Sequence, residues 1–387
     1  MTTIVNNNKI TPTPIVLSDT ATTMSDATNN LFETSPLGSI TSAIGNSIYG
    51  INHRQTPGAI QINKDFYGLT FFTRPQLNLS TGNLQTIRQF APLLSTSPNS
   101  LQRIIRSLLD PRLAKDPDSP VTCALVDDRQ AFIPMLTNHL LSISGWPDVT
   151  APTMTSQEGV YKEVFSMVDG ITANYSTYNI QANFRNIPGD PITLLFLIWC
   201  HYAANVYEGT MVPYPDKIIQ NEIDYNTRIY RLVLDGSKTY VKKIGACGAA
   251  FPTSSPIGAA FNYEHDRPIN SSNDQISINF TAMGAMYQDD ILISEFNATG
   301  EYFNGTLSSV SDIENKIAAI NPNCFNDEGY RKAIKAASKG QYYTKVSSDE
   351  LAIFNNKGYP HINMNTYELG WFVPNELYAQ MMPAVTP

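Results

Sequence analysis

Residues 228–248 read RIYRLVLDGSKTYVKKIGACG, two runs rich in β-forming residues with Asp235-Gly236 between them. An Asp-Gly pair flanked by apolar runs is a strong short-range signal for a two-residue turn between antiparallel strands. This stretch therefore predicts a β-hairpin, and it places antiparallel sheet structure in the middle of the chain.

Further strands are predicted on both sides of this hairpin. Residues 171–185, ITANYSTYNIQANFR, alternate apolar and polar side chains with a phase slip between Tyr175 and Tyr178, which indicates a β-bulge. Residues 275–283 and then 286–296 supply two more strands. Residues 66–80, FYGLTFFTRPQLNLS, begin the ordered part with an aromatic strand and a turn. Together these runs predict a sheet of several antiparallel strands.

The strongest predicted helix is PITLLFLIWCHYAANVYEG at 191–209, with Asp190 as its N-cap and Gly209 as its C-cap. It is apolar on nearly all sides, so we expect it to be buried against the sheet and a partner. Weaker helices are predicted from Ser97 to Leu109 with Ser97 as the cap, across 128–143 with Pro134 in its first turn or at a kink, at 311–320 and at 328–339.

Four regions follow from these patterns. Residues 1–60 are an extended N-terminal arm, 61–150 a strand plus a helical section, 151–305 the β domain, and 306–387 a C-terminal extension with a tail of little periodicity. The first region is poor in charge, unlike most disordered tails, and its isolated aliphatic residues suit docking on neighbouring surfaces. A disordered tail is the alternative for this region.

Composition limits the classes of function. Charged residues make up 16% of the 387 residues and the net charge is −8, which does not favour a general nucleic-acid binder. The four cysteines are far apart and are expected to be small buried hydrophobes. No secretory signal is visible, and the apolar run at 192–206 is too short for a membrane span, so we expect a soluble protein.

The sequence contains no recognisable catalytic or cofactor motif. There is no GxSxG elbow, HExxH, CxxC, EF-hand loop or phosphate-binding loop. The acidic pairs Asp127-Asp128 and Asp289-Asp290 are adjacent residues, which point in different directions, and do not form an acid-base pair. The basic residues of 328–339 form either a solvated face or a contact with an acidic neighbouring subunit. We therefore predict no enzyme activity, no cofactor and no metal site.

The central segment resembles the tail tube fold of bacteriophages. The resemblance covers about a third of the chain and lies in the order of a packing helix, a hairpin, a Phe-Pro turn and a strand of ISINFT type. The segments that carry it are Leu195-Phe196 with Trp199 and Tyr202, IDYNTRIYRLVLD (223–235), GACGAAFPTSSPIGAAFNYE (245–264), DQISINFTAMGAMYQDD (274–290) and, further upstream, FFTRPQLNLS (71–80).

The resemblance implies an α+β fold. Its centre would be a tail-tube-like antiparallel β-sandwich or barrel domain with one packing helix, to which a small helical section and extended N- and C-terminal arms are added. It also implies a hexameric ring whose strands close an intermolecular barrel. Low charge suits a protein whose surface is mostly interface, and a net negative charge suits a passage through which DNA slides.

The helical section and the two arms are additions to the tube-like domain, and they suit a specialised ring better than a subunit repeated along the whole tail. The first hypothesis is therefore a baseplate tube initiator or cap of a contractile tail, which joins the central hub to the tail tube and lines the DNA passage. The alternative is the major tail tube subunit of a large tailed phage, and a non-virion alternative is a β-rich carbohydrate-binding module or enzyme. The expected partners are other copies of the chain, tail tube and baseplate proteins, and DNA in passage without specific binding; no membrane is involved. The expected location is the virion, after assembly in the host cytoplasm.

The predicted sites are therefore interface sites. For barrel closure and ring stacking they are Tyr175, Tyr178, Ile180, Phe184, Ile229, Tyr230, Tyr240, Phe251, Ile276, Ile278, Phe280 and Ile291. For docking of the N-terminal arm they are Ile4, Ile10, Ile15 and Leu17.

Overall fold

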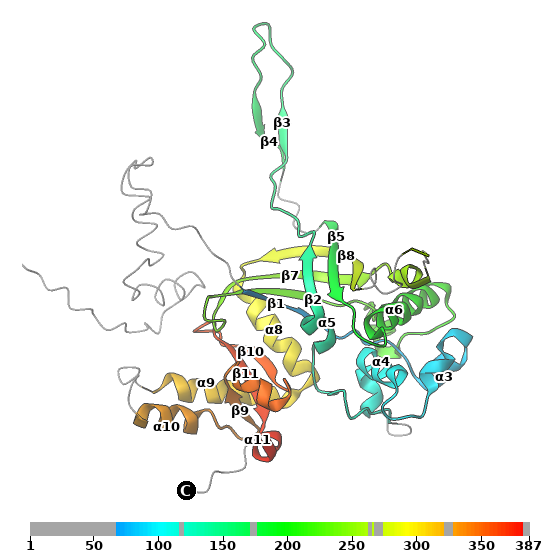
Figure 1. The fold of residues 1–387 in the computed structure, drawn as a ribbon. Coiled ribbons are helices and arrows are strands. Elements are labelled where there is room, and N and C mark those ends of the chain that lie inside the picture. The colour runs from blue at the N-terminus through cyan, green and yellow to red at the C-terminus, as the bar shows by residue number, and fades with distance from the viewer. Residues whose placement is uncertain are drawn as a thin grey trace, which may run out of the picture. The chain divides into compact units, whose positions relative to one another are not determined.

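The computed structural model describes residues 67–115, 120–170, 176–261, 265–266, 274–320 and 328–381 (Figure 1). The chain forms two compact units. The larger unit comprises residues 68–232 and 244–305, and the smaller one includes residues 233–243 and the chain from 306 onward. The four predicted arm residues lie outside the described residues, and so does Tyr175, at the start of the predicted bulge between Tyr175 and Tyr178.

A six-stranded antiparallel sheet forms the centre of the fold. The strands, in their order across the sheet, are β1 (Tyr67–Phe72), β6 (Ile229–Leu234), β7 (Val241–Pro252), β8 (Gln275–Tyr287), β5 (Thr177–Arg185) and β2 (Leu140–Ser144). This confirms a mixed fold with an antiparallel sheet. The sheet is open, with β1 and β2 at its edges, so the chain does not close a barrel on its own.

The predicted hairpin is formed by β6 and β7, but its turn is longer than two residues. It runs from Asp235 to Tyr240, between the end of β6 and the start of β7. The Asp235 carboxylate accepts hydrogen bonds from the backbone N–H groups of Thr239 (2.9 Å) and Tyr240 (3.1 Å). An Asp side chain that satisfies backbone donors in this way stabilises a wider turn.

Helix α6 (Pro191–Glu208) covers one face of the sheet. Its Phe196 ring lies 5.8 Å from Phe184 on β5 and 5.6 Å from Phe280 on β8. Gly209 ends the helix with a φ of +77°, the left-handed conformation expected of a C-cap glycine. Asp190 lies at the N-cap position, but its carboxylate accepts from the Asn186 side chain and caps no backbone N–H.

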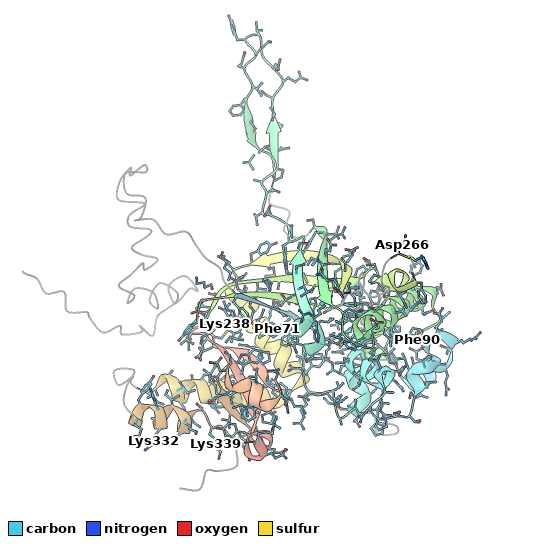
Figure 2. All side chains as sticks on the ribbon, viewed as in Figure 1. Phe71, Phe90, Lys238, Asp266, Lys332 and Lys339 are labelled. Atoms are coloured by element: carbon cyan, nitrogen blue, oxygen red, sulfur yellow. The ribbon has the colours of Figure 1, made fainter. Side chains whose placement is uncertain are left out.

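Helix α8 (Asp290–Phe303) packs on the opposite face, where the sequence predicted a strand across 286–296. Its Phe296 ring lies 5.2 Å from Phe71 of β1 and 5.3 Å from Tyr230 of β6. Figure 2 labels Phe71. The predicted strand was wrong because Asp289 caps a helix by accepting from the Ile291 N–H at 3.0 Å. Strand β8 instead continues to Tyr287.

The helical section is built from short elements. They are α3 (Thr81–Gln85), η1 (Arg88–Leu94), α4 (Leu101–Leu109), η2 (Pro111–Lys115) and α5 (Pro134–His139). The cap of α4 is Ser100, which accepts from the Arg103 N–H, and not Ser97 as predicted. The helix predicted across 128–143 is confirmed only in its middle: α5 begins at Pro134, which lies in its first turn. Residues 128–133 are not helical, and from Leu140 the chain joins β5 as the edge strand β2.

Between β2 and β5 the chain forms a second hairpin, for which no strand was predicted. Its strands β3 (Thr153–Thr155) and β4 (Ser166–Val168) pair in antiparallel register. Two further short helices of the larger unit are α7 (Pro215–Ile219) and η3 (Pro256–Phe261).

The smaller unit has its own three-stranded sheet. The strand order is β10 (Tyr359–Ile362), β11 (Leu369–Pro374) and β9 (Tyr343–Val346). Its helices are α9 (Val310–Ala318), α10 (Glu328–Ala337), η7 (Glu350–Phe354) and α11 (Asn375–Met381), after the short η5 (Gly305–Ser309). The two predicted helices in this region are confirmed. The expected tail without regular structure is wrong, because apolar residues of these strands pack in two small cores.

Candidate subunit-interface surfaces

Most of the predicted interface side chains are buried within the chain itself. Seven of them are at most 5% exposed: Ile180, Phe184, Ile229, Tyr230, Ile276, Ile278 and Phe280. Tyr178, Tyr240 and Phe251 are half-buried, and Ile291 is 57% exposed. That these residues take part in subunit contacts stays a prediction. The buried side chains cannot touch another subunit, so their strands would contribute through backbone pairing.

One face of β5 and β8 bears small polar side chains without charge from Asn179 to Asn183 and on the paired residues of β8, and Arg185 at the end of β5 lies on the same face. Asn179 lies opposite Thr281, Gln181 opposite Asn279, and Asn183 opposite Ser277, and all face away from the core side of Ile180 and Phe280. Such pairs can be stabilised by cross-strand hydrogen bonds. The Gln181 amide donates to the Ser277 hydroxyl at 2.8 Å, and the Asn183 amide donates to Ser142 of β2 at 2.8 Å. Below, this set of residues on β2, β5 and β8 is called the uncharged face.

The two edge strands of the sheet are candidates for pairing with another chain. An edge strand exposes unpaired backbone N–H and C=O groups, which favour the addition of a strand from a neighbour. β2 is five residues long, and its register with β5 shifts between Leu140 and Ser142. Leu141, at this shift, is 46% exposed. These features leave β2 accessible at one edge. At the other edge the end of β1 already bonds to residues 131–133, since the Ile133 N–H donates to the Phe72 carbonyl at 2.9 Å, so only the earlier part of β1 is a candidate for pairing.

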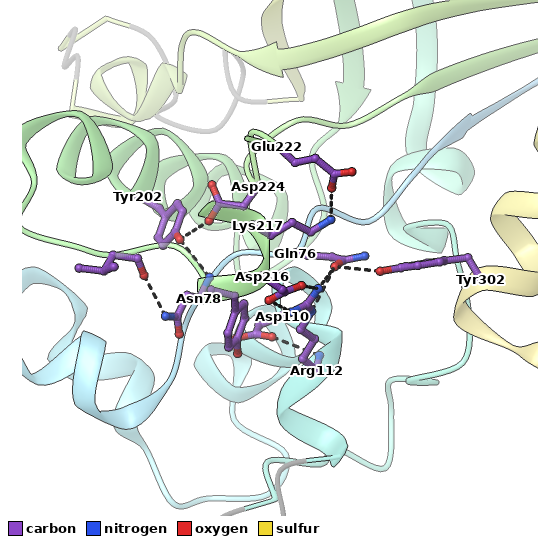
Figure 3. A network of polar contacts seen from close by, with 12 residues as sticks. Gln76, Asn78, Asp110, Arg112, Tyr202, Asp216, Lys217, Glu222, Asp224 and Tyr302 are labelled. Carbon is purple, nitrogen blue, oxygen red and sulfur yellow. Dashed lines mark hydrogen bonds and ion pairs between the residues drawn. The ribbon is translucent and has the colours of Figure 1, made fainter. Parts of the chain in front are cut away.

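A polar network joins the helical section to the segments around α6 and α7 (Figure 3). The Arg112 guanidinium forms a two-bond ion pair with Asp216, both bonds 2.7 Å long, and donates to the Gln76 side chain at 2.8 Å. Tyr202 donates to the Asp224 carboxylate and accepts from the Asn78 N–H at 3.0 Å. These contacts fix the chain on both sides of the turn at 76–80.

Asp110 is the buried acid of this network. Its carboxylate accepts from the Leu79 N–H at 2.8 Å, from the Tyr214 hydroxyl at 2.8 Å and from the Arg112 N–H at 3.2 Å. Burial raises the pKa of Asp110 from 3.8 to about 6, although these hydrogen bonds act in the opposite direction. The fold therefore binds a proton at Asp110 more tightly than the unfolded chain does.

We expect this group to make the protein more stable as the pH falls from 7 to 5. Stability from a raised carboxyl pKa is full below the unfolded value of 3.8 and is lost as the pH rises through about 6. Relative to a pH below 3.8, Asp110 lowers the free energy of unfolding by about 3 kcal/mol at pH 7 and by roughly half of that at pH 5. Thermal unfolding of the wild type and of Asp110→Asn at several pH values measures it. The difference in melting temperature between the two proteins should change with pH. If their melting temperatures change in parallel with pH, the raised pKa of Asp110 is contradicted.

The described part of the chain holds no group of three or more His, Cys, Asp or Glu residues arranged for a metal ion. The acidic pairs have structural contacts instead: Asp128 accepts from the Ser107 hydroxyl at 3.2 Å, and Asp289 caps α8. Cys123 and Cys247 are buried and Cys200 is half-buried, whereas Cys324 lies outside the described residues. None of the described helices has the length and apolar character that a membrane crossing needs.

Helix α10 and the two residues after it present the basic residues that the sequence singled out. Arg331, Lys332, Lys335 and Lys339 are all exposed, and Figure 2 marks Lys332 and Lys339 near the two ends of this set. Lys332 forms an ion pair with Glu328 one turn earlier, at 3.0 Å. A contact of this face with an acidic neighbouring subunit stays a prediction.

Sequence reasoning missed two features of these surfaces. The uncharged face could have been found from the alternation in 177–185 and 275–283, since the polar residues of both strands fall on one side. The hairpin of β3 and β4 has a weaker signal, the apolar run Val164 to Val168, which the turn formers before it conceal. The network around Asp110 joins residues far apart in sequence and gives no local signal.

Comparison with known proteins finds a family model that matches nearly the whole chain. The model of a family described as "putative phage tail tube protein" matches residues 6–386. No curated protein matches the chain.

Solved structures of contractile systems are similar to part of the chain. The anti-feeding prophage cap, a tube-terminating cap, is 17% identical with a TM-score of 0.25, covering 41% of this chain and 82% of the cap. The sheath/tube terminator of an extracellular contractile injection system, PVC, is 18% identical with a TM-score of 0.23, covering 41% and 88%. The sheath-tube complex of that system is 16% identical with a TM-score of 0.25, and the match covers 41% of this chain and 82% of the chain in that complex.

Proposed function

We propose that this chain, which belongs to the family described as putative phage tail tube proteins, forms a hexameric ring in a contractile phage tail. The observation that carries the proposal is the match of the family model to residues 6–386. A match to tail tube proteins over nearly the full length supports a structural role in the tail, in which the chain functions by assembling with other copies and other tail proteins.

The open sheet supports ring formation. Strand β2 of one subunit would pair with β1 of the next, so that the ring closes the barrel that a single chain leaves open. Closure of this kind removes both exposed edges at once. The ring would therefore be more stable than its separate subunits, and wild-type chains would assemble without a cofactor.

The uncharged face would line the passage for DNA. A phosphate backbone binds mainly through Lys and Arg, with a strong dependence on salt. Asn179, Gln181, Asn183, Ser277, Asn279 and Thr281 carry no charge, and five of their six side chains form cross-strand hydrogen bonds. Such a surface stays hydrated and offers DNA no strong binding site.

Lysines on this face should slow DNA release. We expect tails with Asn179→Lys and Ser277→Lys to assemble and to release DNA more slowly, because each lysine adds a phosphate contact. The slowing should decrease steeply as the salt concentration rises. The matched control is Thr96→Lys with Asn99→Lys, two exposed positions on a loop of the helical section. Release from purified particles measures the effect, and equal rates in both variants at low salt would contradict the placement of this face.

Within the tail, we place the ring at the baseplate end, as the initiator or cap that joins the hub to the tube. The smaller unit, with its own sheet and two cores, supplies contacts beyond those that a simple tube subunit needs. The alternative is the major tube subunit. It is favoured by the description of the family and by the extent of its match, which includes the smaller unit.

Copy number distinguishes these two positions. Quantitative mass spectrometry of purified particles should find one or two rings' worth of this chain if it is an initiator or cap. Dozens of rings' worth would identify the major tube subunit. If the chain is absent from purified particles and binds a glycan as a monomer, both positions in the tail are wrong.

A further inference from the structure

The hairpin of β3 and β4 exposes an unusual amount of apolar surface. Every residue from 148 to 170 is exposed, and eight of them are large and apolar. At its tip, Val160 is 94% and Tyr161 91% exposed. Contiguous apolar surface of this kind on a protein marks a site of interaction with a partner.

The tip is held in shape although its side chains are exposed. The Gly159 N–H donates to the Glu163 carbonyl at 3.0 Å, and the Lys162 N–H donates to the Gly159 carbonyl at 3.0 Å. The Tyr161 N–H donates to the Glu163 carboxylate at 2.7 Å. A preformed turn loses little conformational entropy on binding, so its apolar side chains can contribute most of their burial to affinity.

A matching apolar groove lies between η1, α4 and α6. It has a volume of about 420 Å³, and its walls include Phe90, Leu93, Leu197 and Ile198. His201 and Gln102 also line it, so a hydroxyl that enters the groove would meet hydrogen-bonding groups. Figure 2 marks Phe90 in the helical section. A concave apolar site with a few polar groups is the usual form of a binding pocket.

The hairpin and the helical section carry opposite charge. Residues 148–170 contain four acidic residues and one lysine, a net charge of −3. Residues 80–109 contain no acidic residue and three arginines, of which Arg88 is exposed, Arg103 is half-buried and Arg106 is buried, so two positive charges reach the surface. Opposite potentials favour the encounter of two such surfaces and disfavour the contact of two like surfaces. The complementarity is between two different parts of the same chain, which indicates a second copy as the occupant.

We propose that the hairpin tip of one copy docks with Val160 and Tyr161 in this groove of a second copy. The inference rests on the proposed function, since a ring or a stack of rings brings copies together. A contact between two different surfaces of identical chains is heterologous, and contacts of this type close rings or build tubes. The Tyr161 hydroxyl would reach His201 or Gln102, and Arg88 and Arg103 of the helical section would face the acidic hairpin.

Photo-crosslinking tests the contact directly. With p-benzoylphenylalanine in place of Tyr161, we expect crosslinks to peptides that contain residues 89–102 or 194–201 of another copy. The experiment is done on concentrated purified chain and on tails. Crosslinks to other regions, or none in tails that contain the chain, would overturn the docking. Crosslinks in the purified chain, together with its absence from tails, would support the docking and overturn only the proposed function.

A second variant measures the energetic effect. Truncation of an aromatic anchor at the centre of an interface costs at least about tenfold in affinity. Tyr161→Ala should therefore lower the assembly affinity at least about tenfold, while its melting temperature as a monomer stays unchanged. Tyr207→Ala, equally exposed at 94% at the end of α6, should assemble like the wild type. Equal assembly of the two variants would overturn the proposal.

Discussion

Replacement of Arg74 by methionine is expected to lower the free energy of unfolding by about 3–5 kcal/mol, the cost of breaking a buried charged network. Arg74 follows β1 and is 3% exposed. Burial lowers its pKa to about 10, which still leaves it charged at neutral pH. The side chain is therefore a buried cation, and the fold must compensate it.

Backbone carbonyls provide that compensation. The Arg74 guanidinium donates to the Leu108 carbonyl at 2.9 Å, to the Asp127 carbonyl at 3.1 Å and to the Gln130 carbonyl at 3.1 Å. It also donates to the Ser107 carbonyl. One side chain thus connects the end of α4 to the loop at 127–130. A methionine fills similar space but leaves these carbonyls without donors in a buried site.

Urea unfolding followed by tryptophan fluorescence measures this loss. The control is Arg129→Met, an exposed arginine in the same region, which should change stability by less than about 0.5 kcal/mol. If Arg74→Met costs no more than the control, the carbonyls are satisfied by other means and Arg74 does not hold the loop.

Replacement of Phe296 by alanine is the second change with a large expected effect, a loss of about 3–5 kcal/mol. Phe296 is fully buried on α8 and stacks on Phe132 with ring centroids 4.9 Å apart. It also makes edge contacts with Phe71 at 5.2 Å and Tyr230 at 5.3 Å. Alanine would leave a cavity between three rings and remove the packing that holds α8 on the sheet.

The matched control is Phe261→Ala, since Phe261 is 81% exposed. It should change the free energy of unfolding by less than about 0.5 kcal/mol. Phe296→Ala should also increase protease cleavage within α8, because local opening follows the loss of packing. Equal stability of the two variants would show that α8 is held by other contacts.

Elements with strong local signals were predicted well from the sequence. Helix α6 has an apolar pattern with Pro191 at its start and Gly209 at its end, and the hairpin of β6 and β7 has Asp235 at its turn. These signals depend on a few neighbouring residues, so they can be recognised in the sequence without knowledge of the tertiary structure. The two helices α9 and α10 were found for the same reason.

Elements that depend on distant partners were predicted poorly. The stretch 140–144 has a helical pattern together with α5, yet it forms β2 because the edge of β5 is available to it. The C-terminal strands are short and become strands by pairing with each other. In such segments the tertiary contacts outweigh local preference, and the sequence alone does not contain them in readable form.

The candidate site shows the same division. Alternation in β5 and β8 indicates two faces, but it does not say which face the chain covers with its own helix. Ile180 and Phe280 were therefore predicted as interface residues, and they lie in the core beneath α6. The neutral side chains on the opposite side, such as Asn179 and Gln181, became visible as a surface only with the fold.

Electron cryomicroscopy of purified tails tests the central claim most directly, because it locates the chain and shows its neighbours. The account predicts a sixfold ring at the baseplate end of the tube, with β2 of each subunit paired to β1 of the next and the uncharged face toward the channel. A tail without this chain would contradict the account. A chain bound outside the tube, with both sheet edges unpaired, would contradict it equally.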